Sequence, residues 1–142
     1  MSKGNTFESD LLKLIFNGTT IANIADNAGT SPLTNLYVSL HTGDPGEAGD
    51  QTTNEATYTN YARVAVARSG SGWTVTGNSV SPAAAIAFPT ATGGSETITH
   101  AAVGTDASGA GKLLYSGSIS PTIEVVSSVV PSLTTATTIT ED

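Results

Sequence analysis

Apolar side chains near the N-terminus recur with the period of a helix. Phe7, Leu11, Leu14 and Ile15 fall at positions i, i+4, i+7 and i+8. Asn17-Gly18 follows them and is typical of a helix C-terminus. The pattern predicts one short amphipathic helix within residues 1–18, whose apolar stripe docks either on its own domain or on a neighbouring subunit.

Beyond residue 32 the period changes from helical to alternating. Leu36–His41 alternates strictly, with leucine and valine on one face and Tyr37, Ser39 and His41 on the other, which predicts a half-buried strand. Similar short runs recur between turn residues, and residues 42–59 read as a long exposed loop. The predicted strands span 36–41, 61–68, 73–76, 84–88, 97–103, 112–118, 123–130 and 134–140.

About eight short strands with no helices between them predict antiparallel pairing. The expected fold is therefore all-β: an antiparallel sandwich or jelly roll with one N-terminal helix. A length of 142 residues fits a single domain. We expect a helix or arm over residues 1–18 and a β-sandwich over residues 33–142 of that domain.

Composition narrows the functional classes. The formal net charge is −7, with 12 acidic and 5 basic residues, so we expect neither nucleic acid nor an anionic membrane as a partner. The chain has no cysteine, which excludes thiol chemistry and disulfides. The N-terminal residues lack the pattern of a signal peptide, and no apolar run approaches a membrane span.

Residues suited to catalysis are few. His41 and His100 are the two histidines, and both are expected at partly exposed strand positions without a catalytic partner. The loop carboxylates Asp44, Glu47, Asp50 and Glu55 offer oxygen ligands for Ca²⁺, but their spacing matches no EF-hand, and a solvated acidic loop is the simpler interpretation. We therefore expect no enzymatic activity, no catalytic residue, no metal site and no cofactor.

Several residues are candidates for a protein interface. Tyrosine and arginine are enriched at such interfaces because they combine contact area with directed hydrogen bonds. The candidate interface residues are Phe7 and Leu11 on the helix, Tyr58 before the second predicted strand, and Tyr61, Arg63 and Arg68 within it.

The order of several short motifs resembles a known family. The chain resembles small tailed-phage virion proteins often labelled tail fibre proteins, and the resemblance covers nearly its whole length. The motifs are the N-terminal helix ending in Asn17-Gly18, Leu36–Thr42 followed by Asp44-Pro45, Glu55, Tyr61-Ala62-Arg63, Trp73, Ala84–Pro89, Thr99-His100 and Gly111–Gly117.

The resemblance implies a structural part of the phage particle. Long fibres are usually built from repeats or coiled coils, which this chain lacks, so a capsid cement or decoration protein is the leading expectation. It would lie on the capsid exterior, after synthesis in the host cytoplasm, and bridge subunits of the major capsid protein. It would also bind copies of itself as a homotrimer or homodimer.

The alternative expectation is a tail fibre or tail-tip adhesin that binds host glycans. Its signature would be Trp73, Tyr58 and Tyr61 exposed together as a platform on which sugar rings stack.

Overall fold

The computed structural model describes residues 5–21 and 33–141, without the side chains of Asn5 and Phe7. Contacts divide the chain into two compact units. The first consists of Met1–Asn35, Val66–Ala85 and Thr134–Asp142, and the second of Leu36–Ala65 and Ile86–Leu133. The expectation of one structural domain over residues 1–142 stays a prediction.

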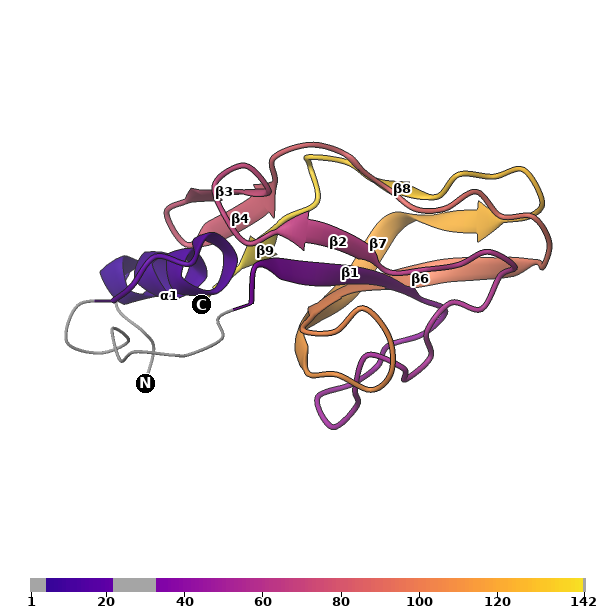
Figure 1. Ribbon diagram of the computed structural model, residues 1–142, viewed down its shortest axis with the longest axis horizontal. Coiled ribbons are helices and arrows are strands. Elements are labelled where there is room, and N and C mark those ends of the chain that lie inside the picture. The colour runs from indigo at the N-terminus through magenta and orange to yellow at the C-terminus, as the bar shows by residue number, and fades with distance from the viewer. Residues whose placement is uncertain (1–4, 22–32, 142) are drawn as a thin grey trace. The chain divides into compact units, whose positions relative to one another are not determined.

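The fold is mostly β, with antiparallel sheets and one short helix, as the alternating pattern predicted (Figure 1). The described strands form three sheets, in the orders β2-β1-β6-β7, β3-β4-β9 and β5-β8. The elements are α1 (Asn5–Asn17), β1 (Asn35–His41), β2 (Val64–Ala67), β3 (Trp73–Thr76), β4 (Ser79–Pro82), β5 (Ile86–Ala87), β6 (Glu96–Gly104), β7 (Leu113–Val125), β8 (Ser132–Leu133) and β9 (Ile139–Thr140).

Helix α1 packs on β3 and β4 of its own unit (Figure 1). Leu12 and Phe16, four residues apart, are fully buried, and the Phe16 ring lies edge-on to Trp73 with centroids 4.7 Å apart. The buried stripe is thus centred on these two residues. Leu11, predicted to lie in it, is only half-buried. The helix ends at Gly18, whose φ of +66° suits glycine.

The second unit is built around β1 and β6. These strands pair in antiparallel register from Tyr37↔Gly104 to His41↔His100. Leu36, Val38 and Leu40 are buried on one face of β1, as predicted. The other face was expected to be exposed, and this is wrong at its C-terminal end, where Ser39 and His41 are also fully buried.

The segment after β1 explains this burial. Residues 42–55 return to β1: Thr42 and Ala56 bond to Asn54 and Leu40, and the Thr53 carbonyl accepts a bond from the His41 ring at 2.9 Å. The expected long exposed loop is therefore a folded segment that covers part of β1. Glycine, proline and acidic residues predict turns but do not show what the turns pack against.

Gln51 fixes this cover to the 105–111 loop. Its side chain is fully buried, bonds to the backbone N–H and carbonyl of Asp106 at 3.0 and 3.3 Å, and lies where a Cβ on Gly104 would stand. The Gln51 N–H also donates to the Ala110 carbonyl at 2.8 Å. Gly104 is thus required for close approach.

Several predicted strand bounds need correction. Residues 61–63 precede β2 as coil, β4 was not predicted, and the strands expected over 84–88 and 134–140 shorten to β5 and β9. The two strands expected over 112–118 and 123–130 are joined in β7, through Pro121. Proline indicates a strand break, but β7 lies at the end of its sheet, where a missing N–H removes no bond to a further strand.

Candidate interaction surface

Strand β7 lies at one end of its sheet. It ends the order β2-β1-β6-β7, and none of the strands in the described ranges pairs with its outer side. Tyr115–Ser118 pairs regularly with His100–Val103, and the register shifts at both ends of this stretch. Beyond Ser118, four residues of β7 lie opposite the single residue Thr99. This mismatch makes a large bulge in β7.

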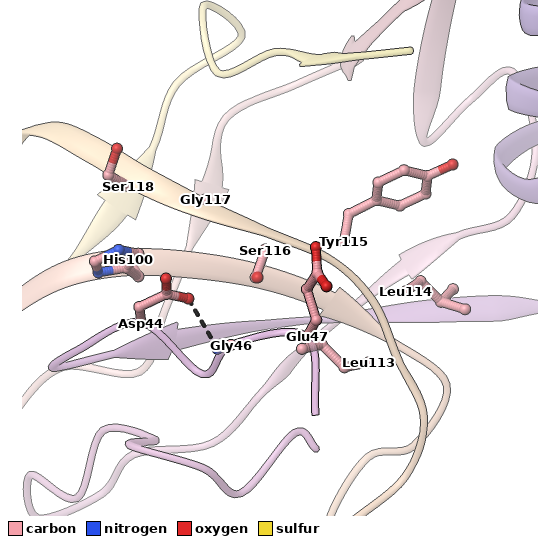
Figure 2. Close-up of a pocket in the computed structure, with 10 residues that line it drawn as sticks. All are labelled: Asp44, Gly46, Glu47, His100, Leu113, Leu114, Tyr115, Ser116, Gly117 and Ser118. Atoms are coloured by element: carbon pink, nitrogen blue, oxygen red, sulfur yellow. Dashed lines mark hydrogen bonds between the residues drawn. The ribbon is translucent and has the colours of Figure 1, made fainter. Parts of the chain in front are cut away.

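A groove lies beside β7. Its volume is about 630 Å³, within the range of ligand pockets, and it is lined by the consecutive residues Leu113–Ser118. The opposite wall consists of Asp44, Gly46, Glu47 and His100 (Figure 2). His100 is the β6 partner of Ser118, and residues 44–47 follow β1, so the groove lies on the side of β7 that faces the rest of its sheet.

The walls of the groove are polar and acidic. Asp44 Oδ1 accepts a bond from the Gly46 N–H at 2.8 Å, which holds the loop in place (Figure 2). Glu47, Ser116 and Ser118 are exposed, whereas Leu113, Leu114 and Tyr115 are half-buried. The hydroxyl groups and the two carboxylates together suit polar contacts with a polypeptide better than a reaction.

Arg63, one of the predicted interface residues, is enclosed within the second unit. The Arg63 side chain is only 2% exposed, and its Nε lies 2.6 Å from Glu55 Oε1. Its remaining nitrogens bond to Glu55 Oε2 and to the carbonyls of Asp106 and Gly109. The hydrogen bond and the charge of Glu55 raise the pKa of Arg63, outweighing burial, which lowers it.

The tyrosines lie in the same unit. Tyr58 is 3% exposed and donates to the Pro89 carbonyl at 3.0 Å, while burial, with the Glu96 charge, raises its pKa to about 12. The Tyr61 hydroxyl accepts from the Leu40 N–H and donates to Glu55, and burial strongly raises its pKa. The two rings lie edge-on, with centroids 5.3 Å apart.

The remaining predicted residues lie in the first unit. Arg68 donates from Nε to the Ile15 carbonyl at 2.6 Å and from Nη2 to the Leu14 carbonyl at 2.5 Å, which satisfies the C-terminal end of α1. Leu11 is half-buried on α1, and the Phe7 side chain lies outside the described residues. An interface role for the six candidates stays a prediction. What the structure places on the β7 groove is a different set.

The expected sugar-stacking platform is not present on these aromatic residues. Trp73 and Tyr58 are each 3% exposed, because Trp73 packs on Phe16 and Tyr58 on Tyr61. Stacking on a sugar needs an open ring face, which these two residues do not offer.

His41 takes part in an arrangement that resembles a nucleophile and its base. Its Nε2 lies 2.8 Å from the Ser39 hydroxyl, and its Nδ1 lies 2.9 Å from the Thr53 carbonyl. A carbonyl only accepts, so Nδ1 carries the proton and Nε2 accepts from Ser39. Both side chains are fully buried, so substrate has no access to them. Burial lowers the pKa of His41. The partly exposed position predicted for His41 is therefore wrong. His100, by contrast, is half-buried, and it lines the groove.

The loop carboxylates are not gathered around a cation position. Asp44 and Asp50 cap turns by accepting from the N–H groups of Gly46 and Thr52, and the Thr52 hydroxyl lowers the pKa of Asp50. Glu55 binds Arg63. Within residues 5–21 and 33–141, no three histidine or acidic side chains converge as metal ligands.

The β7 edge was missed at the level of sequence. Its signal is the stretch Leu113–Ile123, which contains no charged residue and so lacks the lysines that often guard an edge strand. Strand order cannot be read from local alternation, so this stretch was not recognised as an edge.

Comparisons with known proteins and with protein-family models show which family this chain belongs to. No helix in the described part of the chain is long and apolar enough to cross a membrane. A search of curated proteins found no match. A protein-family model described as "Podophage GP4 fiber I protein gp80" matches residues 2–140, nearly the whole chain. The chain therefore belongs to the podophage GP4 fiber I protein gp80 family, a family of structural proteins of the tailed-phage particle.

Proposed function

We propose that this protein is a non-catalytic subunit of a phage fibre, which attaches by protein contacts to other components of the particle. The observation that carries the proposal is the family match over residues 2–140, because the description of that family names a fibre protein. The groove beside β7, with its exposed serines and two carboxylates, supplies a polar surface suited to such attachment. The buried position of the Ser39–His41 pair agrees with a role without catalysis.

Binding to host glycans is not part of this proposal. The aromatic residues expected to stack on sugars are buried inside their own units. A subunit that positions or attaches a fibre needs no sugar site of its own.

A capsid cement is the second candidate. In it, the chain would lie on the capsid exterior and bridge major capsid protein subunits, together with copies of itself as a trimer or dimer. Short strands and a helix of 13 residues in the described part favour it, because they form compact units rather than the long coiled coil of many fibres. In either role, the net charge of −7 argues against contact with the packaged nucleic acid.

Phage particles made without this protein separate the two candidates. A fibre subunit predicts particles that lack a fibre and adsorb poorly to host cells, but whose heads resist heat as before. A cement predicts normal fibres and heads that release DNA at lower temperature. Particles unchanged in fibres, adsorption and head stability would contradict both roles, and the wild-type gene supplied in trans is the control.

A further inference from the structure

We propose that the groove beside β7 binds the side chain of an arginine from another protein. Its guanidinium group would lie between the carboxylates of Asp44 and Glu47 and the hydroxyl groups of β7. The inference deepens the proposed function and rests on it in one respect, that the protein supplying the arginine is another component of the phage particle. The description of the family assigns no binding site to this groove.

The floor of the groove is part of one face of the sheet. Residues directly opposite each other on neighbouring strands lie on the same face. The register therefore places His41, His100 and Ser118 in one row across β1, β6 and β7. The next row joins Ser39 on β1 to Ser116 on β7 through β6. Histidine and serine side chains make this face polar.

The segment 42–55 covers this polar face at β1 but not at β7. Ser39 and His41 are fully buried, whereas His100 on the middle strand is half-buried. Ser116 and Ser118, at the far end of the two rows, are exposed. The groove is thus the part of a polar face that the segment 42–55 leaves open, and hydroxyl groups lie on its floor.

The wall of the groove is acidic. Asp44 and Glu47 are exposed and line it (Figure 2). Asp44 Oδ1 accepts from the Gly46 N–H, but within residues 5–21 and 33–141 no group bonds to Asp44 Oδ2 or to the Glu47 carboxylate. None of the lining residues is lysine or arginine. The charge of the groove is therefore complementary to that of a basic side chain.

Arginine matches this set of acceptors better than lysine or a metal ion. A guanidinium group presents five N–H donors in a planar fork, so it can bond to carboxylates and hydroxyl groups at the same time. Lysine offers three donors on one nitrogen. A metal ion needs ligands that converge, and no three histidine or acidic side chains do so in the described part of the chain.

The arginine must come from a different protein. The chain contains two arginines, Arg63 and Arg68. Arg63 is paired with Glu55 inside its unit, and Arg68 bonds to carbonyls at the end of α1. A second copy of this chain therefore has no arginine side chain to place in the groove.

Titration of the labelled protein with three synthetic peptides tests this binding. The probes are Gly-Ser-Arg-Ser-Gly and the same peptide with lysine or citrulline in place of arginine. Citrulline keeps the shape of arginine but carries no charge. We expect the arginine peptide to shift the NMR signals of His100 and residues 116–118 with a Kd of about 1 mM, because exposed ion pairs contribute little. The lysine peptide should bind more weakly, and the citrulline peptide should cause no shift.

The double variant Asp44→Asn with Glu47→Gln tests the role of charge. It should bind the arginine peptide about two- to tenfold more weakly, since two exposed ion pairs are lost. Glu124→Gln is the matched control, because it removes a carboxylate from β7 outside the groove and should not change the affinity. Thermal melting of each variant confirms that it is folded.

Three results would overturn the proposal: no shift at these residues with the arginine peptide, equal binding of the arginine and citrulline peptides, or the same shifts with calcium chloride alone, which would indicate a metal site.

Particles assembled from equal amounts of wild type and double variant separate the partner from the groove. We expect the wild type to be enriched in the particles. If both are absent from particles, the proposed function fails, while the peptide titration still decides the groove. If both are incorporated equally, no arginine of the particle uses the groove.

Discussion

At the scale of single residues, one buried ion pair holds together parts of the second unit that are distant in sequence. Glu55 accepts from Arg63 and from the Tyr61 hydroxyl, while Arg63 also bonds to carbonyls of the 105–111 loop. A partner lost from such a pair leaves the other charge buried and uncompensated. These residues therefore stabilise the fold. The directed hydrogen bonds that suggested an interface role for arginine and tyrosine are made within the unit.

Replacement of Arg63 by methionine tests this role. We expect Arg63→Met to lower the free energy of unfolding by about 3–5 kcal/mol, because Glu55 would remain largely buried without its cation. Urea denaturation measures the change. Lys112→Met is the matched control, since it removes an exposed cation and should change stability by less than about 0.5 kcal/mol. A loss for Arg63→Met as small as that of the control would contradict the account.

His41 makes stability depend on pH. Burial lowers its pKa below the usual 6.5, outweighing the Thr53 carbonyl and Glu55, which raise it, while Arg63 and His100 lower it further. The unfolded chain therefore binds a proton first as pH falls. The stabilisation from neutral His41 is complete above about pH 6.5 and is lost toward its folded pKa, at up to about 1.4 kcal/mol per pH unit.

Unfolding by urea at about pH 7.5 and about pH 5 measures this dependence. The wild type should lose stability between the two values, and His41→Gln should flatten that part of the curve even if it is less stable at both. His100→Gln should keep the slope, because it leaves the contacts of His41 with Ser39 and Thr53 in place. Equal slopes for the wild type and His41→Gln would refute the assignment.

At the scale of elements, helix α1 depends on a side chain from another part of its unit. Arg68 bonds to the carbonyls of Leu14 and Ile15, which have no partner within the helix, and Phe16 packs on the single tryptophan, Trp73. Docking of α1 on its own unit is therefore visible through tryptophan fluorescence.

Arg68→Met should weaken the end of this helix. Two charge-assisted hydrogen bonds are lost, for which we expect a cost of about 1.5–3 kcal/mol. Trp73 emission should shift to the red at lower urea concentration than in the wild type. Lys13→Met, which removes a half-buried cation from α1, serves as the control. Unchanged unfolding of Arg68→Met would show that the helix end is held in another way.

Local patterns predicted the elements better than their packing. The helix and strands such as 36–41 and 73–76 followed from periodicity, because one face of each packs against the same chain. The burial of Ser39, His41 and Arg63 did not, since it depends on residues 42–55 and 105–111 folding back over β1. The β7 edge was missed for the same reason: strand order is a property of the whole sheet.

At the scale of the whole molecule, the account is of a structural subunit of the phage particle that is stabilised by its buried polar groups. The family match identifies the particle to which it belongs.

The number and position of copies in purified phage particles test this account most directly. Quantitative mass spectrometry gives the copies per particle, and gold-labelled antibody locates them in electron micrographs. A fibre subunit predicts few copies, all at fibres or their attachment points on the tail. Hundreds of copies spread over the head would contradict the fibre role and indicate a capsid cement, and absence from the particle would contradict both.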